Sequence, residues 1–297
     1  MISREQFIEL PLEAVAEQVR AGNLKTCVFP FNGTRRWFLL EHGHKQHPDM
    51  LRSYNDLTGM RYIEMFQMLF DHGIETVLAP VFGGDIMDRG DEYMEAIGSA
   101  MTRLADHPDF RSFYDEYSVR VRFYGEFRKK FQQGPYAYIC DRFDQVGFDT
   151  AHYNKHRLLY GVFASDATES VADISVKFHQ MYQRLPTRRE IIERYYGDYI
   201  EKADLFIGFE KFTIFDYPLL STGDESLYFT AAPSLFMTIA QLRCILYDYL
   251  YLRTIPEPDY YSMSGEEFKS MKEFYEVHRE TTYGTGEVRG GIWYIKP

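Results

Sequence analysis

The hydrophobic and polar positions of the chain form two kinds of segment. Short, continuous apolar runs, typical of buried strands, occupy residues 26–31, 75–81, 119–124, 158–164, 204–209 and 227–230. Longer amphipathic segments, typical of helices, occupy residues 4–21, 51–72, 91–105, 166–184, 187–196 and 235–252. Ser3 and Gly22 are suitable residues to begin and end the first of these helices. Repeated strand–helix–strand order predicts an α/β fold.

The predicted strands are continuous apolar runs because helices cover both faces of a parallel sheet. We therefore expect a central, mostly parallel sheet of about six strands surrounded by helices. The 297 residues contain no linker, repeat or break in composition, so a single domain spanning 1–297 is expected. In such a sheet, functional sites lie at the carboxyl ends of the strands.

Composition and charge exclude several classes of protein. A net charge of −11 argues against general affinity for nucleic acid. Cys27, Cys140 and Cys244 are few and odd in number, which indicates free thiols in a reducing compartment. No apolar stretch approaches the roughly 20 residues of a membrane span, and the N-terminus does not resemble a signal peptide. We expect a cytoplasmic protein without a membrane span.

The candidate chemistry begins directly after the first strand, with Asn32, Gly33, Thr34, Arg35 and Arg36. Arginine matches phosphate oxygens bidentately, and a helix beginning near Thr34 would add the partial positive charge of its N-terminus. The spacing is not that of a P-loop or a dinucleotide-binding fingerprint. A diphosphate site and a solvated basic turn both fit the pattern.

This segment, Phe-Asn-Gly-Thr-Arg-Arg-Trp at 31–37, resembles the signature motif of the cis-prenyltransferases, or Z-prenyl diphosphate synthases. It is still more similar to an offshoot of that superfamily, the tuberculosinol synthase/tuberculosinyl adenosine transferase and kolavelool synthase type. Further matches to the offshoot follow in order at residues 70–77, 88–93, 187–193, 202–209 and 226–230. The chain is therefore identified as a member of this offshoot, which implies a Z-prenyl diphosphate synthase-like sheet and a homodimer.

The resemblance also implies which residues bind the diphosphate and which take part in catalysis. Residues 32–36 would bind the diphosphate of an allylic substrate together with Mg²⁺. Asn32, Tyr54, Asp91 and Tyr93 would be catalytic, with the two tyrosines steering or deprotonating the nucleophile beside the allylic cation. A carboxylate at a helix N-terminus explains Asp91 equally well.

Two departures from the wider family carry the functional argument. Chain-elongating members have an arginine at the position of Gly208, and it holds the diphosphate of the second substrate. A neutral residue cannot replace that guanidinium, so the enzyme should ionise an allylic diphosphate without extending it. Asn32 stands where the family has aspartate, and it is a weak ligand for Mg²⁺ because it lacks the charge. The sequence is compatible with Asn32 as the natural residue of a variant that relies on its arginines, and equally with Asn32 as a substitution made to trap the substrate.

Other motifs have structural explanations. Thr187 and Glu190 form the pattern of a helix capping box, so the arginines between them are interpreted as helix-surface residues. His42, His44 and His47 do not have the spacing of a zinc signature and predict a polar loop. The 24 Tyr and 24 Phe residues are compatible with an apolar tunnel whose rings stabilise a cation.

Three functions fit the sequence. The leading hypothesis is a diterpene synthase that ionises a bicyclic C20 allylic diphosphate of the kolavenyl or tuberculosinyl/halimadienyl type. Water would quench the cation, giving a tertiary alcohol and diphosphate. The alternatives are transfer of the same prenyl group to a nucleoside such as adenosine, and a non-catalytic subunit that only binds the prenyl diphosphate.

Overall fold

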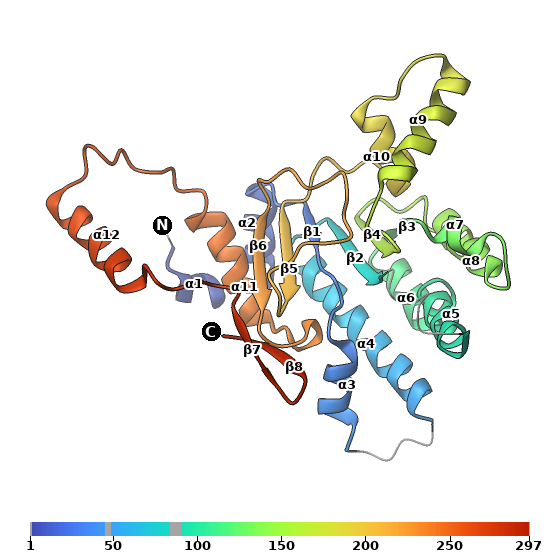
Figure 1. Ribbon diagram of the computed structural model, residues 1–297, viewed down its shortest axis with the longest axis horizontal. Helices are drawn as coiled ribbons and strands as arrows, with labels where there is room; N and C mark the ends of the chain where they lie inside the picture. Colours follow the sequence, from blue (N-terminus) through green and yellow to red (C-terminus); the bar gives the residue numbers. More distant parts are fainter. Residues whose placement is uncertain (1, 45–48, 84–90, 297) are drawn as a thin grey trace.

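The centre of the molecule is a sheet of six parallel strands in the order β3-β4-β2-β1-β5-β6 (Figure 1). The computed structural model describes residues 2–44, 49–83 and 91–296, without the side chains of 91–96. The strands are β1 (Thr26–Val28), β2 (Thr76–Phe82), β3 (Val119–Tyr124), β4 (His156–Val162), β5 (Leu205–Phe209) and β6 (Ser226–Thr230). The predicted α/β class with about six parallel strands is confirmed.

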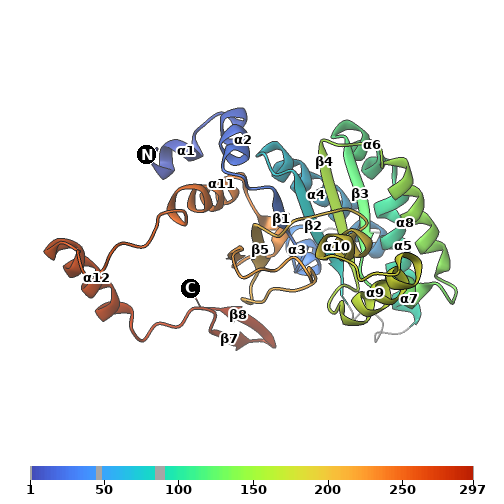
Figure 2. The ribbon, with the colours of Figure 1, turned by 90° about the horizontal axis from the view of Figure 1, so that it is seen from above.

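Helices cover the sheet on both faces (Figure 2). The helices of the described residues are α1 (Arg4–Ile8), α2 (Leu12–Ala21), α3 (Thr34–His42), α4 (Met50–Asp71), α5 (Asp91–Asp106), α6 (Pro108–Glu116), α7 (Phe127–Phe131), α8 (Ala137–Asp149), α9 (Thr168–Tyr182), α10 (Arg188–Tyr196), α11 (Ile239–Tyr247) and α12 (Gly265–His278). Short 3₁₀ and π turns, η2 (Ser234–Phe236) and η3 (Asp248–Leu252), flank α11. Within the described residues, no helix has the length and apolar character needed to cross a membrane.

Three predicted boundaries were wrong for local reasons. The helix predicted over 4–21 is two helices, α1 and α2. Pro11 has no N–H to donate to a helix that continued from α1, and it is the N-cap residue of α2. Strand β1 ends at Val28, although Phe29 and Phe31 still donate to carbonyls of β2, because Pro30 between them donates nothing. The helix predicted from 235 begins at Ile239, where Thr238 forms a capping box.

Helices α6, α7, α8 and α12 were not predicted at all. Helix α7 is too short, at five residues, to show a periodic pattern. The signal of α8 is present in the sequence, because its buried residues Ile139, Cys140, Phe143 and Val146 recur at helical spacing. Helix α12 has a capping box at Ser264 and buries no side chain, so it depends on local sequence preference and not on packing against the sheet.

Alternate residues of the central strands divide the core between the two faces of the sheet. Val77 and Ala79 of β2 point into a large core shared with α4, α5, α6, α8 and α11. Leu78 between them points into a smaller core shared with α10. Because both faces are covered, neither side of these strands is polar, which explains the continuous apolar runs in the sequence.

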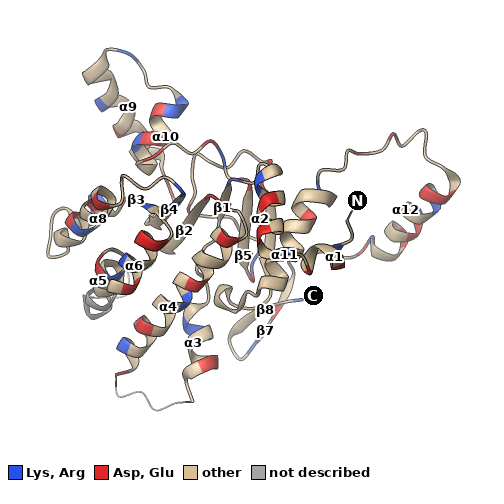
Figure 3. Cartoon of the chain, turned by 180° about the vertical axis from the view of Figure 1, so that it is seen from behind, with Lys and Arg blue, Asp and Glu red and all other residues tan. Residues whose placement is uncertain are grey.

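The C-terminal region extends away from the sheet. Helix α12 stands apart from the other elements, and the antiparallel hairpin of β7 (Gly286–Arg289) and β8 (Ile292–Ile295) returns toward β5 (Figures 1 and 2). The Lys211 ammonium, just beyond β5, lies 6.0 Å from the ring centre of Trp293 in the hairpin. Acidic and basic residues are mixed along helices such as α4 and α12, as expected for solvated faces (Figure 3).

Phe66 lies at the centre of the larger core and should contribute strongly to stability. It is 0% exposed, and its ring lies within 6.0 Å, centre to centre, of the rings of Phe31, Phe113 and Tyr160. Phe66→Ala should lower the free energy of unfolding in urea titrations by about 3–5 kcal/mol, because it leaves a cavity. Phe148→Ala, at a position 80% exposed, is the control and should change it by less than about 0.5 kcal/mol. Equal losses in the two variants would contradict this assignment of the core.

Candidate active site

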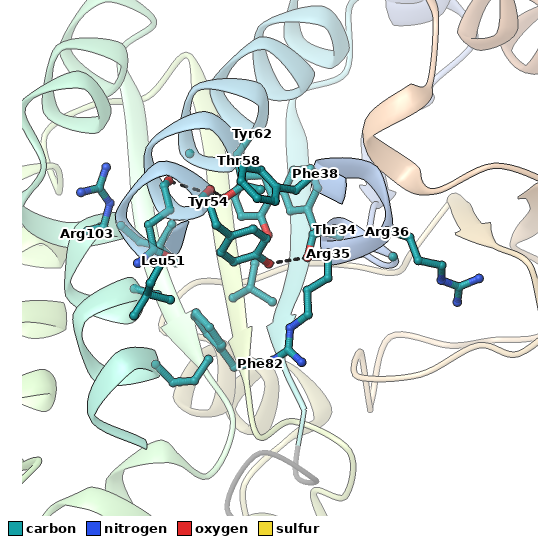
Figure 4. A pocket seen from close by; sticks show the side chains of 18 of the residues that line it. Thr34, Arg35, Arg36, Phe38, Leu51, Tyr54, Thr58, Tyr62, Phe82 and Arg103 are labelled. Atoms are coloured by element: carbon teal, nitrogen blue, oxygen red, sulfur yellow. Dashed lines mark hydrogen bonds between the residues drawn. The ribbon is translucent and has the colours of Figure 1, made fainter. Parts of the chain in front are cut away.

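A cavity of about 790 Å³ opens at the carboxyl ends of β1 and β2, between α3, α4 and α5 (Figure 4). One stripe of α4 lines it with Met50, Leu51, Tyr54, Asn55, Thr58, Gly59 and Tyr62. A facing stripe of α5 adds Ile97, Ala100, Arg103 and Leu104. Its position is the one expected for a site in a parallel sheet.

Gly33 turns the chain from β1 into α3. Its φ of +72° lies in the left-handed region, which favours glycine. A Cβ atom there would also lie 2.8 Å from the Phe209 ring and 3.0 Å from Pro233, so any side chain would be excluded. Helix α3 begins at Thr34 without a side-chain cap from the described residues, and its first N–H groups lack partners within the helix. This helix N-terminus at the cavity favours an anionic group.

Thr34 and Tyr54, which are 20 residues apart in sequence, meet at the mouth of the cavity. Their hydroxyl oxygens lie 2.7 Å apart, and the Phe38 ring packs edge-on against Tyr54 with the ring centres 5.4 Å apart (Figure 4). The structure thus brings together two residues that the motif comparison had predicted for the site. A hydroxyl network at a helix N-terminus can orient a phosphate oxygen or an attacking nucleophile.

The two adjacent arginines point in different directions. Arg35 extends along the cavity toward Phe82, whereas Arg36 turns away from Tyr54 (Figure 4). Arg36 makes a bidentate ion pair with Glu210 at the end of β5, with N–O distances of 2.8 and 2.9 Å. Glu210 is 9% exposed, and its hydrogen bonds raise the pKa of the Arg36 guanidinium.

Sequence analysis did not find Glu210. Its only sequence signal is an acidic residue placed directly after the apolar strand β5. Strand β5 is the neighbour of β1 in the sheet, so the carboxyl ends of the two strands meet. The order of strands in the sheet, and not any local motif, brings Glu210 to Arg36.

Asn32 immediately precedes the Gly33 turn, and Ser234 holds its backbone. Its N–H donates to Ser234 Oγ at 3.0 Å, and its carbonyl accepts from Ser234 N at 3.1 Å. It is not among the residues that line the cavity. Asp91 and Tyr93 belong to the first turn of α5, but their side chains fall outside the described part of the chain, as do residues 84–90. Their predicted roles stay predictions.

The described residues limit how a magnesium ion could be held. Among them, no group of three His, Cys, Asp or Glu side chains could bind a metal. Glu210 is engaged by Arg36, and Asn32 offers a neutral carbonyl oxygen. Mg²⁺ commonly keeps several waters and binds through substrate phosphates plus one or two protein groups. The donor set therefore fits a metal that arrives with a diphosphate.

The interior of the cavity is apolar and aromatic. The ring of Phe31, at the end of β1, stacks on Tyr62 of α4 with the ring centres 3.9 Å apart. Burial raises the pKa of the Tyr62 phenol well above its usual value, so the phenol stays neutral. The charge of Arg103 is paired, because its guanidinium lies 2.6 Å from Asp56. Such walls suit a hydrocarbon group.

The end of β5 has no space for an arginine at position 208. A Cβ atom on Gly208 would lie 2.7 Å from the Phe206 ring and 2.8 Å from the Phe229 ring. The Phe229 ring in turn stacks on Phe212 with their centres 4.7 Å apart. Aromatic rings therefore fill the place where the wider family is expected to hold a second diphosphate.

The other motifs are structural, as far as the structure describes them. Thr187 and Glu190 form the predicted capping box of α10, and Arg189 pairs with Glu193 on the same helix. His42 is the last residue of α3 and packs against Trp37, so the loop predicted around it begins later than expected. His47 lies outside the described residues.

Comparisons with known proteins identify relatives over nearly the whole chain. No protein-family model matches the chain. Tuberculosinyl adenosine transferase from Mycobacterium tuberculosis is 45% identical over 300 residues, covering 100% of this chain and 99% of the relative. A (+)-kolavelool synthase from Herpetosiphon aurantiacus is 24% identical over 97% of this chain and 94% of its own length.

Solved structures show the same fold. Lavandulyl diphosphate synthase from Lavandula x intermedia matches with a TM-score of 0.62 at 12% identity, covering 80% of this chain and 98% of that chain. A probable undecaprenyl diphosphate synthase from Campylobacter jejuni matches with a TM-score of 0.56 at 11% identity, with the same coverage. The chain has the fold of the cis-prenyltransferases, and it belongs to the tuberculosinyl adenosine transferase family.

Proposed function

We propose that this protein is an enzyme that transfers a bicyclic C20 prenyl group from its diphosphate to adenosine or a similar nucleoside. The single observation that carries the proposal is an apolar cavity whose mouth is formed by a helix N-terminus, a hydroxyl pair and an arginine. The 45% identity to a tuberculosinyl adenosine transferase favours nucleoside transfer over the water quenching that the sequence motifs put first. Water remains the second candidate acceptor, because the kolavelool synthase is also a relative.

The diphosphate would lie at the start of α3. The N–H groups of its first turn and Arg35 would stabilise the charge that develops as the allylic carbon–oxygen bond breaks. The bonding electron pair leaves with the diphosphate, and an allylic cation remains. Mg²⁺, held by the diphosphate oxygens and Asn32, would supply further positive charge to the leaving group.

The prenyl group would occupy the cavity between α4 and α5. Stacked Phe31 and Tyr62 offer aromatic faces that stabilise a nearby cation. Thr34 and Tyr54, at the boundary between the polar mouth and the apolar interior, would orient the acceptor. A lone pair of the acceptor, such as a ring nitrogen of adenosine, forms the new bond to the allylic carbon, and a proton is released afterwards.

Chain elongation is disfavoured on electrostatic grounds. At the end of β5 the Glu210 carboxylate already pairs with the Arg36 guanidinium, and the rings around Gly208 leave no space for a second arginine. A second diphosphate would therefore lack the guanidinium contact that an arginine at position 208 would supply. A neutral acceptor such as a nucleoside needs no such contact.

Product analysis tests the proposed function directly. Purified protein, Mg²⁺ and a tuberculosinyl- or kolavenyl-type diphosphate should give a prenylated nucleoside in the presence of adenosine, as measured by mass spectrometry. Without adenosine, the tertiary alcohol should form more slowly. Equal rates of alcohol formation under both conditions, with no nucleoside adduct, would make the protein a diterpene synthase. Binding of the diphosphate without any release of inorganic diphosphate would make it a non-catalytic subunit.

Arg35 and Arg36 should have distinct effects when removed. Arg35→Ala should lower kcat/KM by about 10²–10³-fold, because it deletes a charged contact to the leaving group. Arg36→Ala should also lower the free energy of unfolding by about 1–2 kcal/mol, because it leaves Glu210 unpaired. This loss of stability is smaller than for a fully buried ion pair, because the Arg36 side chain is 41% exposed.

Two further variants control this comparison. Adding Glu210→Ala to Arg36→Ala should restore much of the stability in urea titrations, because no buried charge then lacks a partner. Arg189→Ala on α10, which removes an exposed arginine from the other double-arginine motif, should leave kcat/KM unchanged. Full activity of Arg35→Ala would refute its assignment to the diphosphate.

Asn32→Asp should change the metal dependence of the reaction. A carboxylate at position 32, directly before the turn into α3, would add a hard anionic ligand for Mg²⁺ near the diphosphate. Turnover should rise at least about tenfold, and the Mg²⁺ concentration needed for half-maximal rate should fall, which steady-state kinetics over a Mg²⁺ titration would measure. A lower rate in Asn32→Asp would instead identify asparagine as the working residue.

A further inference from the structure

Gly59 stands in the interior of α4, on the stripe that lines the cavity. Glycine is among the least favourable residues inside a helix, because it loses the most backbone freedom on folding. The 22-residue helix α4 would be more stable with alanine at this position. A glycine here therefore needs an explanation.

The surrounding structure does not require glycine at position 59. A Cβ atom built there lies 3.4 Å from Phe110 Cε2, an ordinary contact, and among the described atoms outside the backbone of α4 and its immediate chain neighbours it meets nothing else within 4 Å. At Gly33 and Gly208, by contrast, a Cβ atom would overlap neighbouring rings at 2.8 and 2.7 Å. A side chain at position 59 would fit the fold, and it would project into the cavity.

The position of Gly59 along α4 matches one part of a prenyl diphosphate. It follows Tyr54, whose hydroxyl meets Thr34 at the mouth, by five residues, which places its Cα about 7–8 Å along the helix axis from the Cα of Tyr54. The small residue Ala100 of α5 and the ring of Phe110 also line the cavity. In a bicyclic allylic diphosphate, several bonds of side chain separate the diphosphate from the fused rings, so the rings fall at this depth.

We propose that Gly59 is a specificity-determining residue that makes the cavity wide enough for a fused ring system. The inference rests on the proposed function and deepens it, because it selects bicyclic over linear C20 groups at the same site. A linear prenyl chain is narrow and can follow the opposite wall. Fused rings are rigid and wide, so even one methyl group on α4 removes space that they need.

Gly147 provides a matched control. It lies in helix α8, does not line the cavity, and a Cβ atom there would meet Arg122 and the Val121 carbonyl at 3.6 and 3.7 Å, which are ordinary contacts. Gly147→Ala should therefore stabilise α8, just as Gly59→Ala should stabilise α4. Any effect of helix stabilisation alone on ligand binding would appear in both variants.

The test compares two unreactive ligands of equal carbon number, a bicyclic and a linear C20 allylic thiolodiphosphate, by titration calorimetry. Gly59→Ala should weaken binding of the bicyclic ligand at least about tenfold and of the linear ligand less than about threefold. Both glycine variants should raise Tm by about 2 °C, and Gly147→Ala should leave both affinities unchanged.

The outcomes separate this inference from the proposed function. If the wild type binds the bicyclic ligand and Gly59→Ala binds it as tightly, the inference is wrong and the proposed function stands. Equal losses for the bicyclic and linear ligands also overturn the inference. If the wild type binds neither ligand, the proposed function is wrong, and the inference falls with it.

Discussion

The turn at Gly33 determines where each polar group at the mouth of the cavity lies. Its left-handed backbone directs the chain from β1 into α3, and Phe209 and Pro233 pack so closely against it that a side chain has no room. The first N–H groups of α3, the Thr34–Tyr54 contact and the Arg36–Glu210 pair all follow from this one turn. Local backbone geometry and contact with β5 therefore act together to build the site.

The charges at the cavity are balanced, in keeping with a protein whose net charge is −11. Arg36 pairs with Glu210 and Arg103 pairs with Asp56, so two arginines that line the cavity have carboxylate partners. In the proposed function, oriented donors at the N-terminus of α3, together with Arg35, would recognise the diphosphate without a general excess of positive charge.

Positions that break local rules mark the site. Gly59 lowers the stability of α4 where the fold would accept alanine, and Asn32 lacks the charge that a metal ligand at a diphosphate usually has. Glu210 has a φ of +65°, which is uncommon for a residue other than glycine. Such departures from the locally favoured residue are expected where function, and not folding, sets the choice.

Short-range periodicity and contiguous motifs in the sequence predicted the six strands, helices such as α4, α5 and α10, and the motif at residues 32–36. The family resemblance pointed to Tyr54, whose hydroxyl lies beside Thr34 in the structure. Helix α8 was not predicted, although its buried residues recur at helical spacing. The three-dimensional arrangement alone shows that Arg35 and Arg36 diverge and that Glu210, 174 residues from Arg36, is its partner. It likewise shows that Gly59 faces an open cavity. These features depend on the order of strands in the sheet and on which helix face meets it, and long-range packing sets both.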